Sequence, residues 1–236
     1  MSVLRPLLLV LGAIPCVAAT FGTVVPHAQP LADLVIDEAR RRLYVVNTYS
    51  NSLEVYATNV SPPRQTNVIK TKATPLSAAI SRNGRYLYVA CYDGSSLGVI
   101  DLTSASFPSH SISLSAKPEA VAVGLDEKVL ISTIGTGTGS NVLVTYDPNS
   151  AALATVLVAP PAPAVAQFPP PNGVMYLASK ARLHASADGK IIAGVHVLAN
   201  NTRTVFVYDA ASATVLRSRL ARLALAVSCA PKGSSA

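Results

Sequence analysis

The stretch Leu43-Tyr44-Val45-Val46-Asn47 decides the fold, because it returns 44 positions later as Leu87-Tyr88-Val89-Ala90-Cys91. Downstream of it, residues 53–56 match residues 97–100 at the same offset. Two less regular copies lie further along the chain, at residues 129–147 and 191–209. Self-similarity at a fixed period of this length indicates a repeat architecture.

Each copy carries the signals of short β-strands joined by turns. A first apolar segment leads to Asn83-Gly84 or Asp188-Gly189, dipeptides that supply the positive φ angles of a two-residue hairpin turn. A second segment, rich in β-branched and aromatic residues, and a third apolar segment follow. Three of the third segments end in an aspartate, which we expect to bond the backbone of the outgoing turn: Asp101, Asp147 and Asp209. A fourth segment is visible at residues 111–114 and 154–158.

Four short strands in about 44 residues, without helical periodicity, predict an all-β protein built of four-stranded antiparallel blades, a β-propeller. Residues 225–229 match a first strand again, so we expect about four blades plus the start of a fifth, an incomplete ring. A Pro/Ala-rich insertion separates the third and fourth copies at residues 160–179. The expected blades occupy residues 30–74, 75–117, 118–159 and 180–224, and the fifth begins at 225–236.

The repeated segments at residues 43–47 and 87–89 resemble the YVTN-type β-propeller repeat, a WD40-like repeat. The resemblance covers about residues 30–236, although the third and fourth copies are degenerate. It implies a bacterial or archaeal protein that is exported or surface-associated, commonly with seven blades. Similar propellers include lactonase-like enzymes and the haem d1 and quinoprotein dehydrogenases, so the resemblance alone assigns no activity.

The N-terminus predicts export. Arg5 precedes an apolar stretch at residues 7–14, and small residues follow, which is typical of a signal peptide at residues 1–19 with cleavage near Thr20. We expect residues 20–236 to be secreted, periplasmic or bound to the cell surface, with no transmembrane segment after the signal is removed. Cys91 and Cys229 then remain, and their unrelated repeat positions predict two buried thiols rather than a disulfide.

The composition excludes disorder, since 50% of the residues are hydrophobic and only 13% are charged. The formal net charge is +7, but the basic residues are scattered apart from residues 40–42. Aromatic residues do not interleave with them, so we expect no nucleic-acid partner.

The search for chemistry finds no catalytic constellation. The four histidines His27, His110, His184 and His196 have neither metal-ligand spacing nor a carboxylate or cysteine close in sequence. His184 lies on a first strand, the one nearest the central channel of a propeller. Asp33 and Glu119 begin first strands, where a channel mouth could present them to a ligand. These three residues are the candidate binding residues, and we expect no catalytic and no metal-ligating residues.

The sequence therefore favours a non-catalytic binding or surface-interaction module without a cofactor, whose partner is a protein, a polysaccharide or another cell-surface ligand. A lactonase-like hydrolase or a cofactor-dependent oxidoreductase remains the alternative. Several polar side chains converging at one channel mouth would favour an enzyme, and a channel lined by small residues would favour binding.

Overall fold

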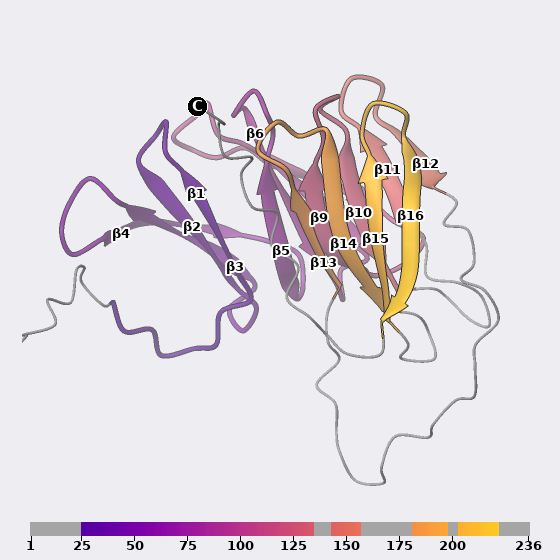
Figure 1. Ribbon diagram of the computed structural model, residues 1–236. Helices are drawn as coiled ribbons and strands as arrows, with labels where there is room; N and C mark the ends of the chain where they lie inside the picture. The colour runs from indigo at the N-terminus through magenta and orange to yellow at the C-terminus, as the bar shows by residue number, and fades with distance from the viewer. Residues whose placement is uncertain (1–24, 135–142, 157–180, 198–202, 222–236) are drawn as a thin grey trace, which may run out of the picture.

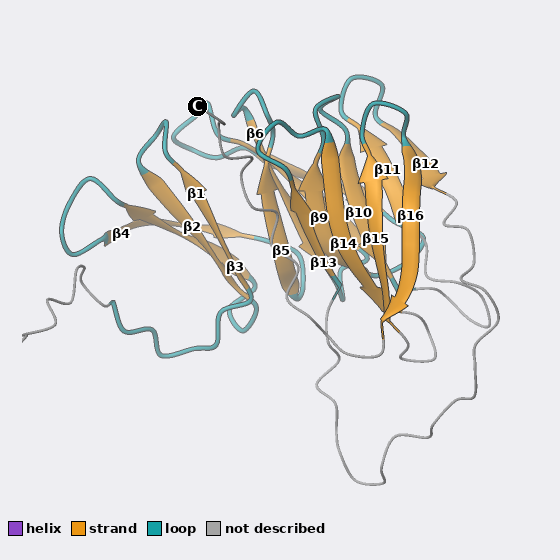
Figure 2. Cartoon of the chain, viewed as in Figure 1, coloured by secondary structure: helices purple, strands orange, loops and turns teal. Residues whose placement is uncertain are grey.

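A computed structural model describes residues 25–134, 143–156, 181–197 and 203–221. The predicted signal peptide, the Pro/Ala-rich insertion and the start of the fifth blade lie outside these residues. The described residues form strands, turns and loops (Figure 2). In this part of the chain there is no helix of the length and apolarity needed to cross a membrane.

The strands pair in sequence order into four antiparallel sheets of four strands, here called blades 1 to 4. Blade 1 contains β1 (Asp33–Asp37), β2 (Arg42–Asn47), β3 (Ser52–Ala57) and β4 (Arg64–Lys70). Blade 2 contains β5 (Pro75–Ile80), β6 (Tyr86–Cys91), β7 (Ser96–Asp101) and β8 (Ser109–Ser113). Blade 3 contains β9 (Pro118–Val123), β10 (Val129–Thr133), β11 (Leu143–Asp147) and β12 (Ala152–Val156). Blade 4 contains β13 (Arg182–Ala185), β14 (Ile191–Val197), β15 (Arg203–Asp209) and β16 (Thr214–Ala221).

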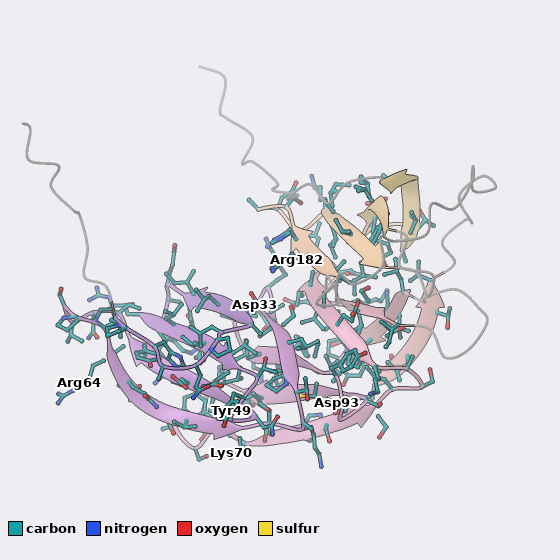
Figure 3. The ribbon with its side chains drawn as sticks, turned by 90° about the horizontal axis from the view of Figure 1, so that it is seen from below. Asp33, Tyr49, Arg64, Lys70, Asp93 and Arg182 are labelled. Carbon is teal, nitrogen blue, oxygen red and sulfur yellow. The ribbon has the colours of Figure 1, made fainter. Side chains whose placement is uncertain are left out.

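The blades stand face to face around a common centre (Figure 1). Their first strands meet in the order β1, β5, β9, β13, so each blade presents its first strand to the centre and its fourth strand to the rim. The four described sheets form an open arc rather than a closed ring (Figure 3). The predicted fold class, an all-β propeller with an incomplete ring, is confirmed.

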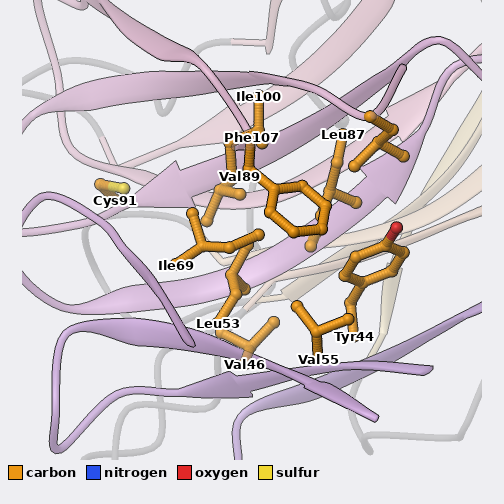
Figure 4. Packing of buried hydrophobic residues seen from close by; sticks show 12 residues of the cluster. Tyr44, Val46, Leu53, Val55, Ile69, Leu87, Val89, Cys91, Ile100 and Phe107 are labelled. Carbon is orange, nitrogen blue, oxygen red and sulfur yellow. The ribbon is translucent and has the colours of Figure 1, made fainter. Parts of the chain in front are cut away.

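The hydrophobic core consists of layers between neighbouring blades. Tyr44, Val46 and Leu53 of blade 1 pack against Leu87 and Val89 of blade 2 (Figure 4). A second layer joins blades 2 and 3, and a third joins blades 3 and 4. Burial of one such Val or Leu side chain contributes about 1.5–3 kcal/mol.

The layered core explains the apolar run that marks each second strand. In β6 the side chains alternate between the two faces of the sheet, and both faces are covered by another blade. Leu87 and Val89 face blade 1, while Tyr88 and Ala90 face blade 3, and all four are fully buried. A strand covered on both faces is continuously apolar instead of alternating.

The hairpin turns differ from the sequence expectation. Gly84 and Gly189 have φ angles of 70° and 72°, as predicted, but Asn83 and Asp188 do not have positive φ. The last pair before the turn of blade 2 is Ser81 with Tyr86, so the loop is longer than two residues. The expected two-residue hairpin was therefore wrong. Asn83 acts through its side chain, since its Oδ1 accepts hydrogen bonds from the Ser81 hydroxyl and the Arg85 N–H.

The aspartates that end the third strands behave as predicted. Asp101 accepts a hydrogen bond from the N–H of Thr103 at 2.8 Å, and Asp147 accepts one from Asn149 at 2.9 Å. Asp209 bonds the N–H of Ser212 in the same way. The hydroxyls of Thr103 and Ser212 also donate to Asp101 and Asp209. These hydroxyl bonds, together with the backbone bonds, lower the pKa of the carboxyls, and at Asp147 the backbone bond is the main cause.

Candidate functional site

The centre of the arc is lined by the free edges of the first strands, whose outward N–H groups have no neighbouring strand to bond. Blade 1 supplies one of the missing acceptors. The Oδ2 atom of Asp33 in β1 lies 3.0 Å from the backbone nitrogen of Ala78 in β5. The same carboxylate accepts the N–H of Leu34 through Oδ1 at 2.9 Å. Asp33 thus ties the first strands of blades 1 and 2 together.

The same kind of tie recurs at the next two blade boundaries. The hydroxyl of Ser77, 44 residues after Asp33, lies 3.5 Å from the N–H of Val121 and bridges blades 2 and 3. Glu119 in β9 is buried, and its Oε2 accepts the N–H of Ala181 just before β13 at 3.1 Å. Asp33 and Glu119 therefore serve different boundaries, and the structure does not bring them into one cluster.

The fourth blade presents two cationic or titratable side chains at its first strand. His184 and Arg182 are both exposed in β13. Figure 3 shows Arg182 and Asp33 on the side of the arc where the first strands converge. His196 belongs to β14, but its side chain lies outside the described part of the chain.

Sequence reasoning missed a polar cluster on the outer face of blade 1. Glu54 in β3 is 9% exposed, and its carboxylate accepts hydrogen bonds from Asn47 at 2.7 Å and from the Tyr56 hydroxyl at 2.9 Å. His27 in the segment before β1 places Nε2 3.1 Å from both carboxylate oxygens. No carboxylate close in sequence pointed to this pair, because the fold joins residues 27 apart.

The electrostatics of this cluster follow from its hydrogen bonds. Burial alone would raise the pKa of Glu54, but the bonds from Asn47, Tyr56 and His27 outweigh it and lower that pKa. Nδ1 of His27 lies 2.7 Å from the Gln29 carbonyl oxygen, closer than the Gln29 N–H at 3.1 Å. This carbonyl and the Glu54 carboxylate both raise the pKa of His27. Burial and Glu54 raise the pKa of Tyr56 to about 12.

The repeat supplies the signal that could have revealed the cluster. Asn47, Glu54 and Tyr56 occupy the positions of Cys91, Gly98 and Ile100 in blade 2, 44 residues later. Those blade 2 positions face blade 1, whereas the same face of blade 1 has no described blade in front of it. Polar side chains at repeat positions that hold Cys, Gly and Ile in blade 2 are thus the signal of this cluster.

Cys91 is a free, buried thiol. Burial raises its pKa to about 11, although backbone N–H groups of Lys72 and Gly98 oppose the shift. Cys91 is thus a small hydrophobic residue, as expected, and Cys229 lies outside the described residues. Within the described ranges, no three His, Cys, Asp or Glu side chains are grouped so that they could hold a metal ion.

Comparison with known proteins agrees with this architecture. Residues 22–122 match the family model of lactonases with a seven-bladed β-propeller. The match covers less than half of the 236 residues and agrees with the β-propeller fold. A search of the curated proteins finds no match.

Similar solved structures are propellers of larger proteins. Hydrazine synthase of Kuenenia stuttgartiensis is 17% identical with a TM-score of 0.62, and the match covers 89% of this chain and 53% of that one. A proposed 6-phosphogluconolactonase of Bacteroides uniformis is 12% identical with a TM-score of 0.54, covering 80% and 55%. Dihydro-haem d1 dehydrogenase is 14% identical with a TM-score of 0.54, covering 82% and 38%. The chain spans about half or less of each protein, and identities this low show the fold alone.

Proposed function

We propose that the protein is an exported β-propeller of the YVTN repeat type that acts as a non-catalytic binding or surface-interaction module. The observation that carries this proposal is that two carboxylates of the first strands bond neighbouring blades. Asp33 and Glu119, the acidic candidates nearest the centre, each accept an N–H group from the next blade. Both carboxylates therefore take part in the packing of neighbouring blades, which supports a structural role for them.

Ala78 of β5 and Ala120 of β9 are buried between blades, so these two small side chains do not line the centre. Arg182 and His184 of β13 are both exposed. A cation and an imidazole suit hydrogen bonding to an acidic or hydroxyl-rich surface, which supports a protein or polysaccharide of the cell envelope as the partner.

Co-sedimentation with an insoluble cell-wall polysaccharide tests this binding role. The unaltered chain is expected to sediment with the polysaccharide, and the double variant R182A/H184A to lose most of that binding. R64A removes an exposed arginine from the outer strand β4 and serves as the matched control. Equal sedimentation of R182A/H184A and R64A would contradict the assignment to β13.

Export is tested separately. Expression of the full chain in a bacterial host, followed by mass spectrometry of the exported protein, is expected to give a start near Thr20. An exported product that still begins with Met1 would contradict the predicted signal peptide.

The match of residues 22–122 to the lactonase family favours a second candidate, a lactonase-like hydrolase. Hydrolysis of 6-phosphogluconolactone by the purified chain, measured by acid release, distinguishes the two. A rate that rises with protein concentration above the spontaneous rate would favour the hydrolase, and no such rate is expected of a binding module.

A further inference from the structure

A groove opens at the rim of the propeller, between the outer strand of blade 1 and blade 2, far along the sheets from the central strands. Its volume is about 370 Å³. The floor is formed by Val89, Cys91 and Ile100 of blade 2, all of them buried. Figure 4 shows these three side chains together on one face of blade 2.

The groove exists because Gly98 lacks a side chain. Gly98 lines it and occupies the repeat position of Glu54 in blade 1. A Cβ atom added at Gly98 would be in ordinary contact with Val89 Cβ at 3.5 Å and Cys91 Sγ at 3.9 Å, so a methyl group fits there without a clash. The groove therefore has an apolar base, and its volume lies within the range of about 300–1,000 Å³ that is typical of ligand pockets.

The rim of the groove is cationic. Lys70 ends β4 and Lys72 follows it, while His110 lies opposite them in β8 between two serines. No Asp or Glu lines the groove, and neither lysine forms an ion pair with another described residue. The stem of Lys72 packs tightly, because a Cβ atom on Gly94 would lie 2.8 Å from its Cβ.

The next blade boundary provides an internal comparison. A groove of about 90 Å³ lies between blades 2 and 3 at the equivalent positions, 44 residues later. There Leu114, Ala116 and Ala154 replace Lys70, Lys72 and His110. The propeller architecture thus produces a small neutral groove at this place. Of the two grooves, the one between blades 1 and 2 has the larger volume and the lysines at its rim.

We propose that this groove binds an organic anion with an apolar body. The phosphate or carboxylate of the ligand lies between the two lysines and His110, and the apolar body lies over Gly98 on Cys91 and Ile100. Opposite charge on the rim and an apolar floor are the two features that recognise such a molecule. The inference concerns a site separate from β13 and does not depend on the proposed function.

Isothermal titration of the full chain with phenyl phosphate at low salt tests the proposal. Binding is expected, and the variant K70Q/K72Q should weaken it by at least about tenfold. G98L places a side chain in the groove and should weaken it by a similar factor. K190Q removes a lysine from an exposed turn of blade 4, so its affinity should stay within about twofold of the unaltered chain.

Two further ligands distinguish the contribution of the charge from that of the apolar body. Inorganic phosphate lacks the apolar body and benzyl alcohol lacks the charge, and both should bind more weakly than phenyl phosphate. Circular dichroism tests whether each variant is folded, and K70Q/K72Q should fold because it changes exposed side chains. Absence of phenyl phosphate binding up to about 10 mM, or equal affinity of K70Q/K72Q and K190Q, would overturn the proposal.

Discussion

The guanidinium of Arg82 donates a hydrogen bond from Nη2 to the carbonyl oxygen of Ala187 at 2.8 Å, across 105 residues of sequence. This bond joins the hairpin turns of blades 2 and 4. The turn of blade 3 lies between them, because Glu127 accepts the N–H groups of Arg82 and Asn83 at 3.0 and 2.8 Å. The N–H of Leu125 also bonds the carbonyl oxygen of Gly189 at 2.7 Å. The three turns therefore hold blades 2 to 4 in a fixed arc.

Removal of the Glu127 carboxylate should loosen this arc. Glu127→Ala deletes two charge-assisted bonds at a partly exposed site, so the free energy of unfolding should fall by about 1–2 kcal/mol. Glu127 also has a φ angle of 63°, and Glu127→Gly should therefore be less destabilised than Glu127→Ala. Chemical denaturation measures both. Glu38→Ala, at the exposed turn of blade 1, is the matched control. Equal unfolding free energies of E127A and E38A would show that the Glu127 hydrogen bonds do not stabilise the fold.

The tie between blades 3 and 4 gives a second prediction. Glu119→Ala leaves the N–H of Ala181 without its carboxylate acceptor in a buried place, which should cost about 1–3 kcal/mol of unfolding free energy. Glu119→Gln keeps an acceptor oxygen of the same reach and should cost less. Thermal unfolding measures the order of the three proteins. Equal unfolding temperatures of the unaltered protein, E119A and E119Q would show that the Glu119 carboxylate does not stabilise the fold.

Much of this architecture could be read from the sequence. The 44-residue offset between Tyr44 and Tyr88 located the strands, because both lie at buried positions of second strands. Asp101 and Asp147 could be assigned to turns because an aspartate bonds the backbone two residues ahead, which is a local interaction.

The ties between blades could not be read in the same way. Asp33 bonds Ala78 across 45 residues, and Glu119 bonds Ala181 across 62. Sequence spacing predicts which residues share a blade, but it does not say which side chain reaches the free edge of the next blade. Both carboxylates lie on first strands, and the backbone groups that they bond became visible only in the folded arrangement.

The contact between His27 and Glu54 predicts a pH dependence. The raised pKa of His27 means that its stabilising effect is complete below pH 6.5, the ordinary value, and is lost as the pH rises through the folded-state pKa. The lowered pKa of Glu54 means that its effect is complete above pH 4.5 and is lost as the pH falls through the folded-state pKa. Attachment of the segment before β1 should therefore be strongest between about pH 4.5 and 6.5.

Hydrogen exchange at Ala32, whose N–H donates to the Val46 carbonyl oxygen at the end of this segment, measures the attachment. Protection should fall as the pH rises above about 6.5, after correction for the intrinsic exchange rate, and His27→Gln should remove this pH dependence. The exposed His110 offers the control, since His110→Gln should leave the profile of Ala32 unchanged. A profile that persists in His27→Gln would assign the titration to another group.

Two glycines in strand interiors test the packing of the blades against each other. Gly194 in β14 faces Leu183 and Phe206, and an added Cβ would lie 2.6 Å from Leu183 Cδ2 and closer still to Phe206 Cζ. Gly98 in β7 has its nearest neighbour at 3.5 Å, an ordinary contact distance. Neither glycine has a positive φ angle, so the two sites differ in space and not in backbone conformation.

Gly194→Ala should therefore destabilise the protein by about 1–3 kcal/mol, because the layer between blades 3 and 4 must shift to admit the methyl group. Gly98→Ala should be neutral or stabilising by less than about 1 kcal/mol, since alanine restricts the unfolded chain more than glycine does. The double variant G194A/F206L provides the decisive measurement, because leucine lacks the ring atoms that meet the new Cβ. Its unfolding free energy should exceed the value expected from adding the two single effects. Additive single effects, or equal melting temperatures of G194A and G98A, would mean that Phe206 does not fill the space above Gly194.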